Sequence, residues 1–114
     1  MSNNVNPGGE RLLFTAVLAY DKPGEETKAA RAEHMKAHLD YMVENQDKML
    51  IAGPIFGEDN QSIIGSMLIY KTDSQAEARA WLEADPYFAA DFWDKVVFRT
   101  FRGAIGSAVG GVTW

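Results

Sequence analysis

The chain has 114 residues, a formal net charge of −5 and no cysteine, with 46% apolar and 24% charged residues. This composition indicates one globular domain, and it excludes a mainly disordered chain, a disulfide framework, a thiolate metal site and a cysteine nucleophile. The acidic balance disfavours nucleic-acid binding and no apolar run reaches the roughly 20 residues of a membrane span, so we expect a small, soluble, cytoplasmic protein.

The predicted elements follow a polar lead at residues 1–10, which we expect to be disordered and which lacks the basic and apolar regions of a signal peptide. Apolar runs predict strands over residues 12–20, 49–55, 62–71 and 95–102. A first helix is predicted over residues 27–45, with Thr27 as its N-cap. A second helix begins at the capping box Ser74-Gln75-Ala76-Glu77 and ends near Asp85, because Pro86 disfavours helical geometry in the residue before it.

The domain is expected to span residues 11–102, and the uncharged, Gly-rich tail, residues 103–114, follows it. Two interpretations of the tail stay open. It either lies over the pocket of a second copy, with Trp114 as an anchor, or is disordered.

The order β-α-β-β-α-β predicts an α+β, ferredoxin-like sandwich, in which two helices cover one face of a four-stranded antiparallel sheet. Apolar residues alternate on both faces of the predicted strands, and two helices can cover only one of those faces. We therefore expect the open face to pair with a second copy in a homodimer, with a higher oligomer left open. The first helix is expected to bury one apolar face, made of Ala32, Met35, Leu39, Met42 and Val43.

Both histidines, His34 and His38, lie one turn apart on the first helix. His38 falls at the edge of the predicted apolar face, beside Arg31. An imidazole there could reach a cavity and still exchange protons, and its ordinary pKa of about 6.5 suits general acid–base chemistry at neutral pH. A half-buried structural histidine is the plainer interpretation. A metal site on the two histidines would need a carboxylate from elsewhere, and we predict none.

Asp85 stands where the second helix ends, a position at which the helix dipole disfavours a negative charge. It is either a solvated helix stop or a carboxylate that holds a histidine of the first helix in one tautomer, since both helices cover the same face. The surrounding aromatic side chains belong to the core or to a dimer contact, or a subset walls a pocket for a flat ring. We name Trp81 and Tyr87 as candidates for that wall, with Gly53 and Pro54 at the end of the second strand.

Three stretches of the chain carry a resemblance: Ala37-His38-Leu39-Asp40-Tyr41-Met42, Leu50-Ile51-Ala52-Gly53-Pro54 and Ala84-Asp85-Pro86-Tyr87. Together they resemble the YCII-related family of the dimeric α+β barrel superfamily. The resemblance implies a ferredoxin-like fold, dimerisation and an active-site His–Asp dyad, which falls on His38 and Asp85. Family members often carry an arginine three residues before that histidine. This chain has Met35 there, so Arg31, one turn earlier, is the candidate for contact with an anionic substrate.

Some members of the family resemble dehydrochlorinases of chlorinated hydroquinones, and related dimeric barrels isomerise lactones. Our leading hypothesis is therefore a small, cofactor-independent enzyme that performs elimination or isomerisation on an aromatic or ring-shaped substrate. His38 would move a proton, Asp85 would orient it, and Arg31, His34, Gly53, Pro54, Trp81 and Tyr87 would contact the substrate. The alternative is a non-catalytic, dimeric module that binds a small ligand or serves a neighbouring enzyme.

Overall fold

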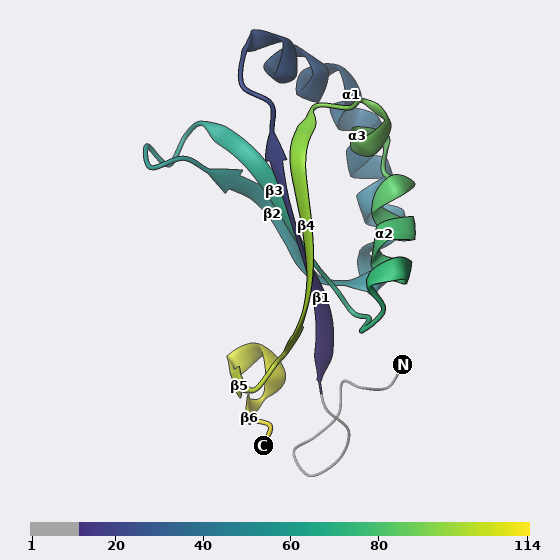
Figure 1. Ribbon diagram of the computed structural model, residues 1–114, viewed down its shortest axis with the longest axis vertical. Coiled ribbons are helices and arrows are strands. Elements are labelled where there is room, and N and C mark those ends of the chain that lie inside the picture. The colour runs from purple at the N-terminus through teal and green to yellow at the C-terminus, as the bar shows by residue number, and fades with distance from the viewer. Residues whose placement is uncertain (1–11) are drawn as a thin grey trace.

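The computed structural model describes residues 12–114, and the predicted lead at residues 1–10 lies outside the described residues. The four predicted strands pair into one sheet and the helices cover one of its faces (Figure 1). The main elements follow the predicted order β-α-β-β-α-β, with the short helix α3 added before the last strand: β1 (Leu13–Asp21), α1 (Glu25–Glu44), β2 (Met49–Phe56), β3 (Ile63–Tyr70), α2 (Gln75–Glu83), α3 (Pro86–Ala89) and β4 (Trp93–Arg102).

The strand order β2-β3-β1-β4, with all neighbours antiparallel, confirms the ferredoxin-like α+β prediction. The register sends alternate residues of each strand to opposite faces. On the helix-covered side, Val17, Leu68 and Phe98 are buried in one cluster with Ala78 and Leu82 of α2. Half of the predicted capping box forms: the Ser74 hydroxyl accepts a hydrogen bond from the Glu77 N–H at 3.0 Å. The Ser74 N–H donates to the Thr72 hydroxyl instead of to Glu77, whose carboxylate accepts from that same hydroxyl.

The opposite face of the sheet, which we call the open face, has no helix over it. Leu18 pairs with Met67 of β3 and with Val97 of β4, so these three residues form a row across its centre. Tyr20, Met67 and Phe101 on this face are 37%, 41% and 41% exposed. The sheet therefore carries apolar side chains on both faces, and only one face is covered within the described chain.

Helix α1 differs from the prediction at its start and along its apolar face. It begins at Glu25 after Gly24, and Thr27 is buried within the first turn, so the predicted Thr27 N-cap is wrong. The predicted buried face is also wrong: Met35, Leu39 and Val43 are 46%, 52% and 64% exposed. Met35 and Leu39 are exposed because this side of α1 stands away from β2 and β3 and lines a cavity instead of closing onto the sheet, whereas Val43 does not line it.

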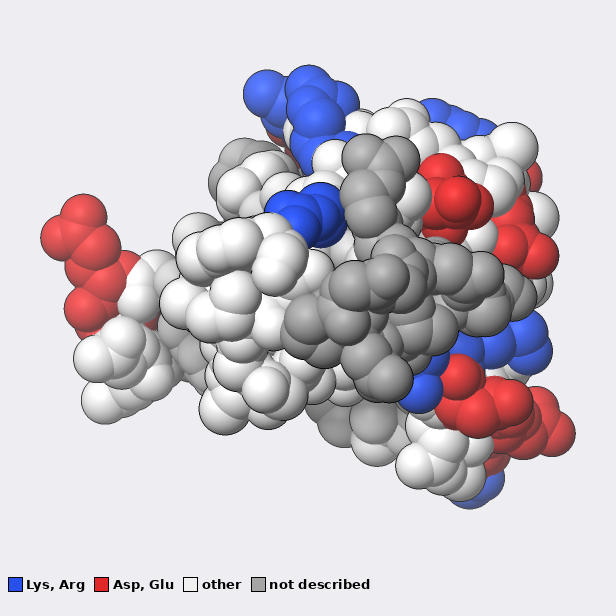
Figure 2. All heavy atoms as spheres, turned by 90° about the horizontal axis from the view of Figure 1, so that it is seen from below, with Lys and Arg blue, Asp and Glu red and all other residues white. Residues whose placement is uncertain are grey.

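The tail at residues 103–114 folds into a small hairpin of β5 (Ile105–Gly106) and β6 (Gly111–Val112), joined by the 3₁₀ turn Ser107–Val109. Val109 packs against the open-face cluster that contains Leu12 and Phe14. The hairpin lies at the end of the sheet away from the β2–β3 turn, and its uncharged surface is part of the white area in Figure 2. The prediction of a disordered tail is therefore wrong for this segment, and Trp114 is 70% exposed.

No helix among residues 12–114 is long and apolar enough to cross a membrane.

The close approach of β3 to β1 at Gly65 yields a test of the fold. Gly65 pairs with Tyr20 of β1, and a Cβ at position 65 would overlap the carbonyl oxygen of Ala19. We expect Gly65→Ala to lower the free energy of unfolding by about 1–3 kcal/mol, because backbone atoms must shift to admit the methyl group. Urea denaturation measures this change.

The matched control is Gly53→Ala on the neighbouring strand β2, where a Cβ would meet nothing within 4 Å. Its free energy of unfolding should change by less than about 0.5 kcal/mol. Equal losses in the two variants would contradict the assigned contact between Gly65 and Ala19.

Candidate functional site

A cavity of about 320 Å³ separates α1 from the β2–β3 half of the sheet. Its volume falls in the lower part of the range for small-molecule sites, about 300–1,000 Å³, and suits a single substituted ring. Most lining side chains are apolar, and four polar or charged ones, on α1, β3 and the α2–α3 junction, join them. The lining residues are Arg31, Met35, His38, Leu39, Met42, Ala52, Gly53, Pro54, Ile63, Ser66, Leu68, Asp85, Tyr87 and Trp93.

His38 and Asp85 meet at the wall of this cavity. The His38 Nδ1 atom lies 2.8 Å and 3.0 Å from the two carboxylate oxygens of Asp85. The Asp85 side chain is 1% exposed and that of His38 is 15% exposed. A carboxylate accepts hydrogen bonds, so this contact favours the proton on Nδ1 and leaves Nε2 for a ligand.

The position of Asp85 follows from the local sequence. Asp85 follows the C-cap of α2, Ala84, and is the N-cap of α3, where its carboxylate accepts a hydrogen bond from the Tyr87 N–H at 2.9 Å. Pro86 at the first position of α3 supplies the φ angle that a helix start requires. The carboxylate is therefore held by its own helix start and by His38, which compensates for its burial.

Arg31, which also lines the cavity, belongs to a nearly buried ion pair. The Arg31 guanidinium donates to both oxygens of Asp21 at 2.6 Å and 2.8 Å, and to the Ser66 hydroxyl at 3.1 Å. Both charged side chains are nearly buried, at 11% and 7% exposed. This bidentate geometry ties α1 to β1 and β3, and it neutralises the arginine that we proposed as an anion contact.

The cavity contains six of the eight predicted site residues: Arg31, His38, Gly53, Pro54, Asp85 and Tyr87. The other two, His34 and Trp81, do not line it. His34 is partly exposed, and its Nε2 lies 3.9 Å from a Glu33 carboxylate oxygen. Trp81, in the last turn of α2, packs against Tyr70, with the Lys48 ammonium 5.8 Å from its ring.

Several cavity residues were missed because sequence patterns assigned them to the core. Met35, Leu39 and Met42 have the spacing of a buried helix face, and this spacing does not distinguish the wall of a cavity from a packed interior. Ser66 could have been identified from the sequence as a site residue, since it is a polar residue on the inward-facing side of an apolar strand.

Among residues 12–114, no group of three or more histidine, aspartate and glutamate side chains has an arrangement that could hold a metal ion. A metal bound by His34 and His38 would therefore lack a third ligand within the described chain.

Comparisons with known proteins give the same fold. Residues 13–102 match the YCII-related domain. The chain is 30% identical over 97 residues to Protein YciI of Escherichia coli O6:H1 and, equally, to Protein YciI of Shigella flexneri, covering 79% of this chain and 97% of each relative. It is also similar to the structure of 5-chloro-2-hydroxyhydroquinone dehydrochlorinase (TftG) from Burkholderia phenoliruptrix AC1100 in complex with 2,5-dihydroxybenzoquinone. That similarity has a TM-score of 0.65 and 26% identity, over 82% of this chain and 96% of the other.

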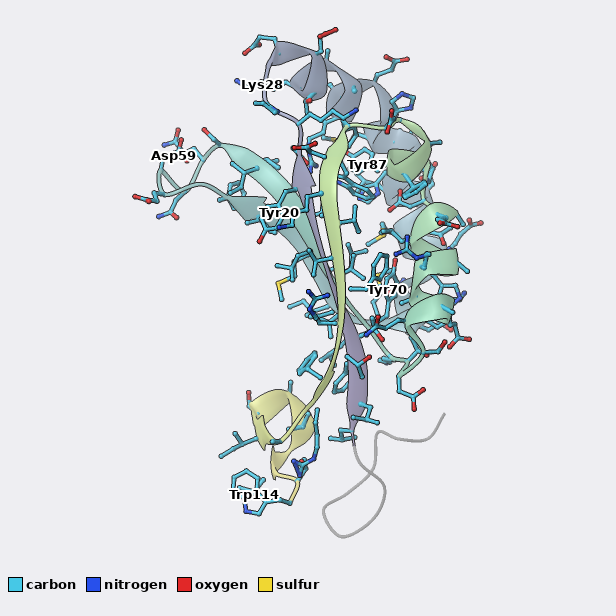
Figure 3. All side chains as sticks on the ribbon, viewed as in Figure 1. Tyr20, Lys28, Asp59, Tyr70, Tyr87 and Trp114 are labelled. Carbon is cyan, nitrogen blue, oxygen red and sulfur yellow. The ribbon has the colours of Figure 1, made fainter. Side chains whose placement is uncertain are left out.

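Three tyrosines lie close to the buried Asp85 carboxylate. Burial, reinforced by the negative charge of Asp85, raises the pKa of Tyr41. Burial also raises the pKa of Tyr87 and, most strongly, that of Tyr70. The Tyr70 residue is 1% exposed, and its hydroxyl has no hydrogen-bond partner among the described residues. Figure 3 shows Tyr70 and Tyr87 between the sheet and the helices, on the side away from Tyr20.

These tyrosines predict a loss of stability at alkaline pH. A tyrosine whose pKa is higher in the folded chain stabilises the fold below its unfolded pKa of about 10, and this contribution disappears as the pH rises further. We expect the free energy of unfolding to fall above pH 10, by up to about 1.4 kcal/mol per pH unit for each proton retained by the folded state. Urea denaturation between pH 8 and pH 11 measures it.

Tyr70→Phe is the matching variant. It should reduce the alkaline loss, and at pH 7 it should be as stable as the parent or more stable, because the removed hydroxyl has no partner. A loss above about 1 kcal/mol at pH 7 would mean that this hydroxyl is hydrogen-bonded in solution.

Proposed function

The chain belongs to the YCII-related domain family, and on that basis we propose that it is an enzyme that moves a proton on a small, ring-shaped substrate in the α1–sheet cavity. One observation carries the proposal: the His38 imidazole both contacts the buried Asp85 carboxylate and lines the cavity. A histidine oriented by a carboxylate on one nitrogen is available on the other as a general base or acid.

The chemistry of the cavity supports a flat substrate with polar substituents. Apolar side chains from α1, β2 and β3 form most of its wall and suit the faces of a ring. The Ser66 hydroxyl and the edge of Arg31 offer polar contacts away from His38. The similar Burkholderia structure is a dehydrochlorinase in complex with a dihydroxybenzoquinone, which favours an oxygen-substituted ring for this chain as well.

In the proposed reaction, His38 Nε2 accepts a proton from the substrate. In an elimination, chloride leaves with its bonding electrons while the proton passes to His38, so that HCl is lost in total. In an isomerisation, His38 returns the proton to a different atom of the same substrate. Asp85 stabilises the imidazolium that forms in both cases.

The proposed reaction uses no cofactor, because proton transfer and departure of chloride require no electron acceptor. We also propose the cytoplasm as the location, since a chain without cysteine gains nothing from an oxidising compartment.

We further propose that the protein works as a homodimer through the open face. That face carries the central row Leu18, Met67 and Val97, and the exposed Ile51, 68% exposed, lies beside it on β2. The C-terminal hairpin lies on the same side of the sheet, and the exposed Ile105 and Trp114 add to its apolar surface. Exposed apolar surface of this kind is typical of an interface, and a second copy provides a self-complementary cover.

The catalytic proposal predicts the effect of replacing either His38 or Asp85. We expect His38→Gln and Asp85→Asn to lower kcat by about 10²–10⁴-fold, the usual contribution of a general acid or base. The assay follows chloride release from 5-chloro-2-hydroxyhydroquinone, and lactones serve as candidate substrates for isomerisation.

His34→Gln is the control, since His34 lies one turn from His38 on the same helix and does not line the cavity. It should keep the parental kcat within about twofold. Undiminished turnover in His38→Gln would sink the proposed reaction, and ligand binding without turnover of any compound would favour the non-catalytic module.

The dimer proposal predicts a monomer when a charge enters the central row. Met67→Glu places a carboxylate in the middle of the open face, where burial against a second copy would be unfavourable. Sedimentation equilibrium should give a dimer for the parent and a monomer for the variant. Val43→Glu, on the exposed side of α1 and 64% exposed before substitution, should stay dimeric. Equal masses for Met67→Glu and the parent would argue against this interface.

A further inference from the structure

Asp85 alone does not fix the orientation of the His38 ring. The imidazole turns about its Cβ–Cγ bond, and at Nδ1 only the hydrogen bonding to Asp85, which a rotated ring would lose, opposes that rotation. The direction of Nε2, which the proposed reaction uses, changes with that rotation. A second contact must define the plane of the ring if Nε2 is to meet the substrate in one orientation.

Tyr87 supplies this second contact. Its ring stacks on the His38 imidazole with 3.8 Å between ring centroids and 5° between ring planes. Such a parallel stack opposes rotation of the imidazole, because turning the ring would push its edge into the face of the tyrosine. The same residue's N–H donates to Asp85 Oδ1 at 2.9 Å, so Tyr87 contacts both members of the pair.

The tyrosine ring is itself held on its remaining sides. Its hydroxyl donates to the Arg31 carbonyl oxygen of α1 at 3.3 Å. The rings of Phe92 and Trp93 meet it edge to face, with centroids at 4.9 Å and 6.3 Å. The Arg31 guanidinium, fixed by Asp21, lies 5.3 Å from its centroid. Tyr87 is therefore a rigid surface for His38 to rest on.

This packing leaves little of Tyr87 for a substrate. The residue is 3% exposed although it borders the cavity, and one ring face is covered by His38. The sequence placed Tyr87 among the substrate contacts, whereas its neighbours in the structure are mainly the catalytic candidates and the residues that support them.

We infer that Tyr87 is a positioning residue, which fixes the plane of His38 and thereby the direction of Nε2. This inference rests on the proposed function, because a fixed Nε2 matters only if His38 transfers a proton. Tyr87 acts through His38 and Asp85 and does not itself exchange a proton with the substrate.

The first test uses the unaltered protein and NMR of its two histidines. The ring current of the stacked tyrosine should shift the His38 ring protons upfield of those of His34, which has no aromatic ring stacked on it within the described chain. The ¹⁵N shifts of neutral His38 should show one tautomer, with the proton on Nδ1. A His38 spectrum without the upfield shift would overturn the inference before any substitution is made.

The second test compares three variants. Tyr87→Leu removes the ring but keeps the backbone N–H that Asp85 accepts, so we expect kcat to fall by about tenfold to a hundredfold with KM nearly unchanged, and the second tautomer of His38 to appear. Tyr87→Phe keeps the stack and should retain one tautomer and a kcat within about threefold. Phe98→Leu removes a buried ring of β4 that is 6% exposed and lies against the Arg79 guanidinium, and it should cost stability without changing the tautomer.

The outcomes separate this inference from the proposed function. A single tautomer and parental kcat in Tyr87→Leu would assign Tyr87 to packing alone and overturn the positioning role. Undiminished turnover in His38→Gln would overturn the reaction, whereas the tautomer measurements would still decide whether Tyr87 orients His38. If Tyr87→Leu does not fold, the ring-current test and the Tyr87→Phe tautomer remain decisive.

Discussion

The Asp85 carboxylate is almost completely buried, and a buried charge is stable only where hydrogen bonds replace the water it has lost. Asp85 receives these bonds from the Tyr87 N–H and from His38, which lies 47 residues earlier in the chain. Removing one partner of such a buried pair commonly costs about 3–5 kcal/mol. The contact therefore fixes where α1 lies relative to the α2–α3 junction, and the position of the cavity follows from it.

Helix α1 is held in place largely by polar contacts, and this explains why a cavity can exist beneath it. Arg31 joins the helix to Asp21 and Ser66 of the sheet, and His38 joins it to Asp85, two turns further along. Between these points the helix does not need apolar packing to stay in position. Its Met35 and Leu39 side chains consequently line open space, although their spacing is that of a buried face.

The sequence predicted the strands and the face that the helices cover, because strand alternation, a capping box and an Asp-Pro stop are local signals with direct physical causes. The choice of His38 as the partner of Asp85 came from the family resemblance, since the local signals left open whether Asp85 contacts a histidine of the first helix. The predictions from sequence were wrong where the position of a side chain depends on packing between segments that are far apart in the chain. Whether α1 closes onto the sheet, and whether Trp81 reaches the cavity, is decided by contacts between distant segments. Local sequence signals also did not predict the fold of the tail. Val109 packs against Leu12 and Phe14, which are close to it in space but lie near the start of the described chain.

Strand β2 forms one edge of the sheet, and Pro54 lies within it, opposite Ser66 of β3. An edge strand is a template on which a further chain can add by backbone hydrogen bonding, and this is a common route to aggregation. Proline has no N–H to offer to such a chain and is tolerated within a sheet mainly at its edges. Pro54 therefore lines the cavity and also opposes the addition of a further strand at this edge of the sheet. Replacing it would affect solubility as well as the site.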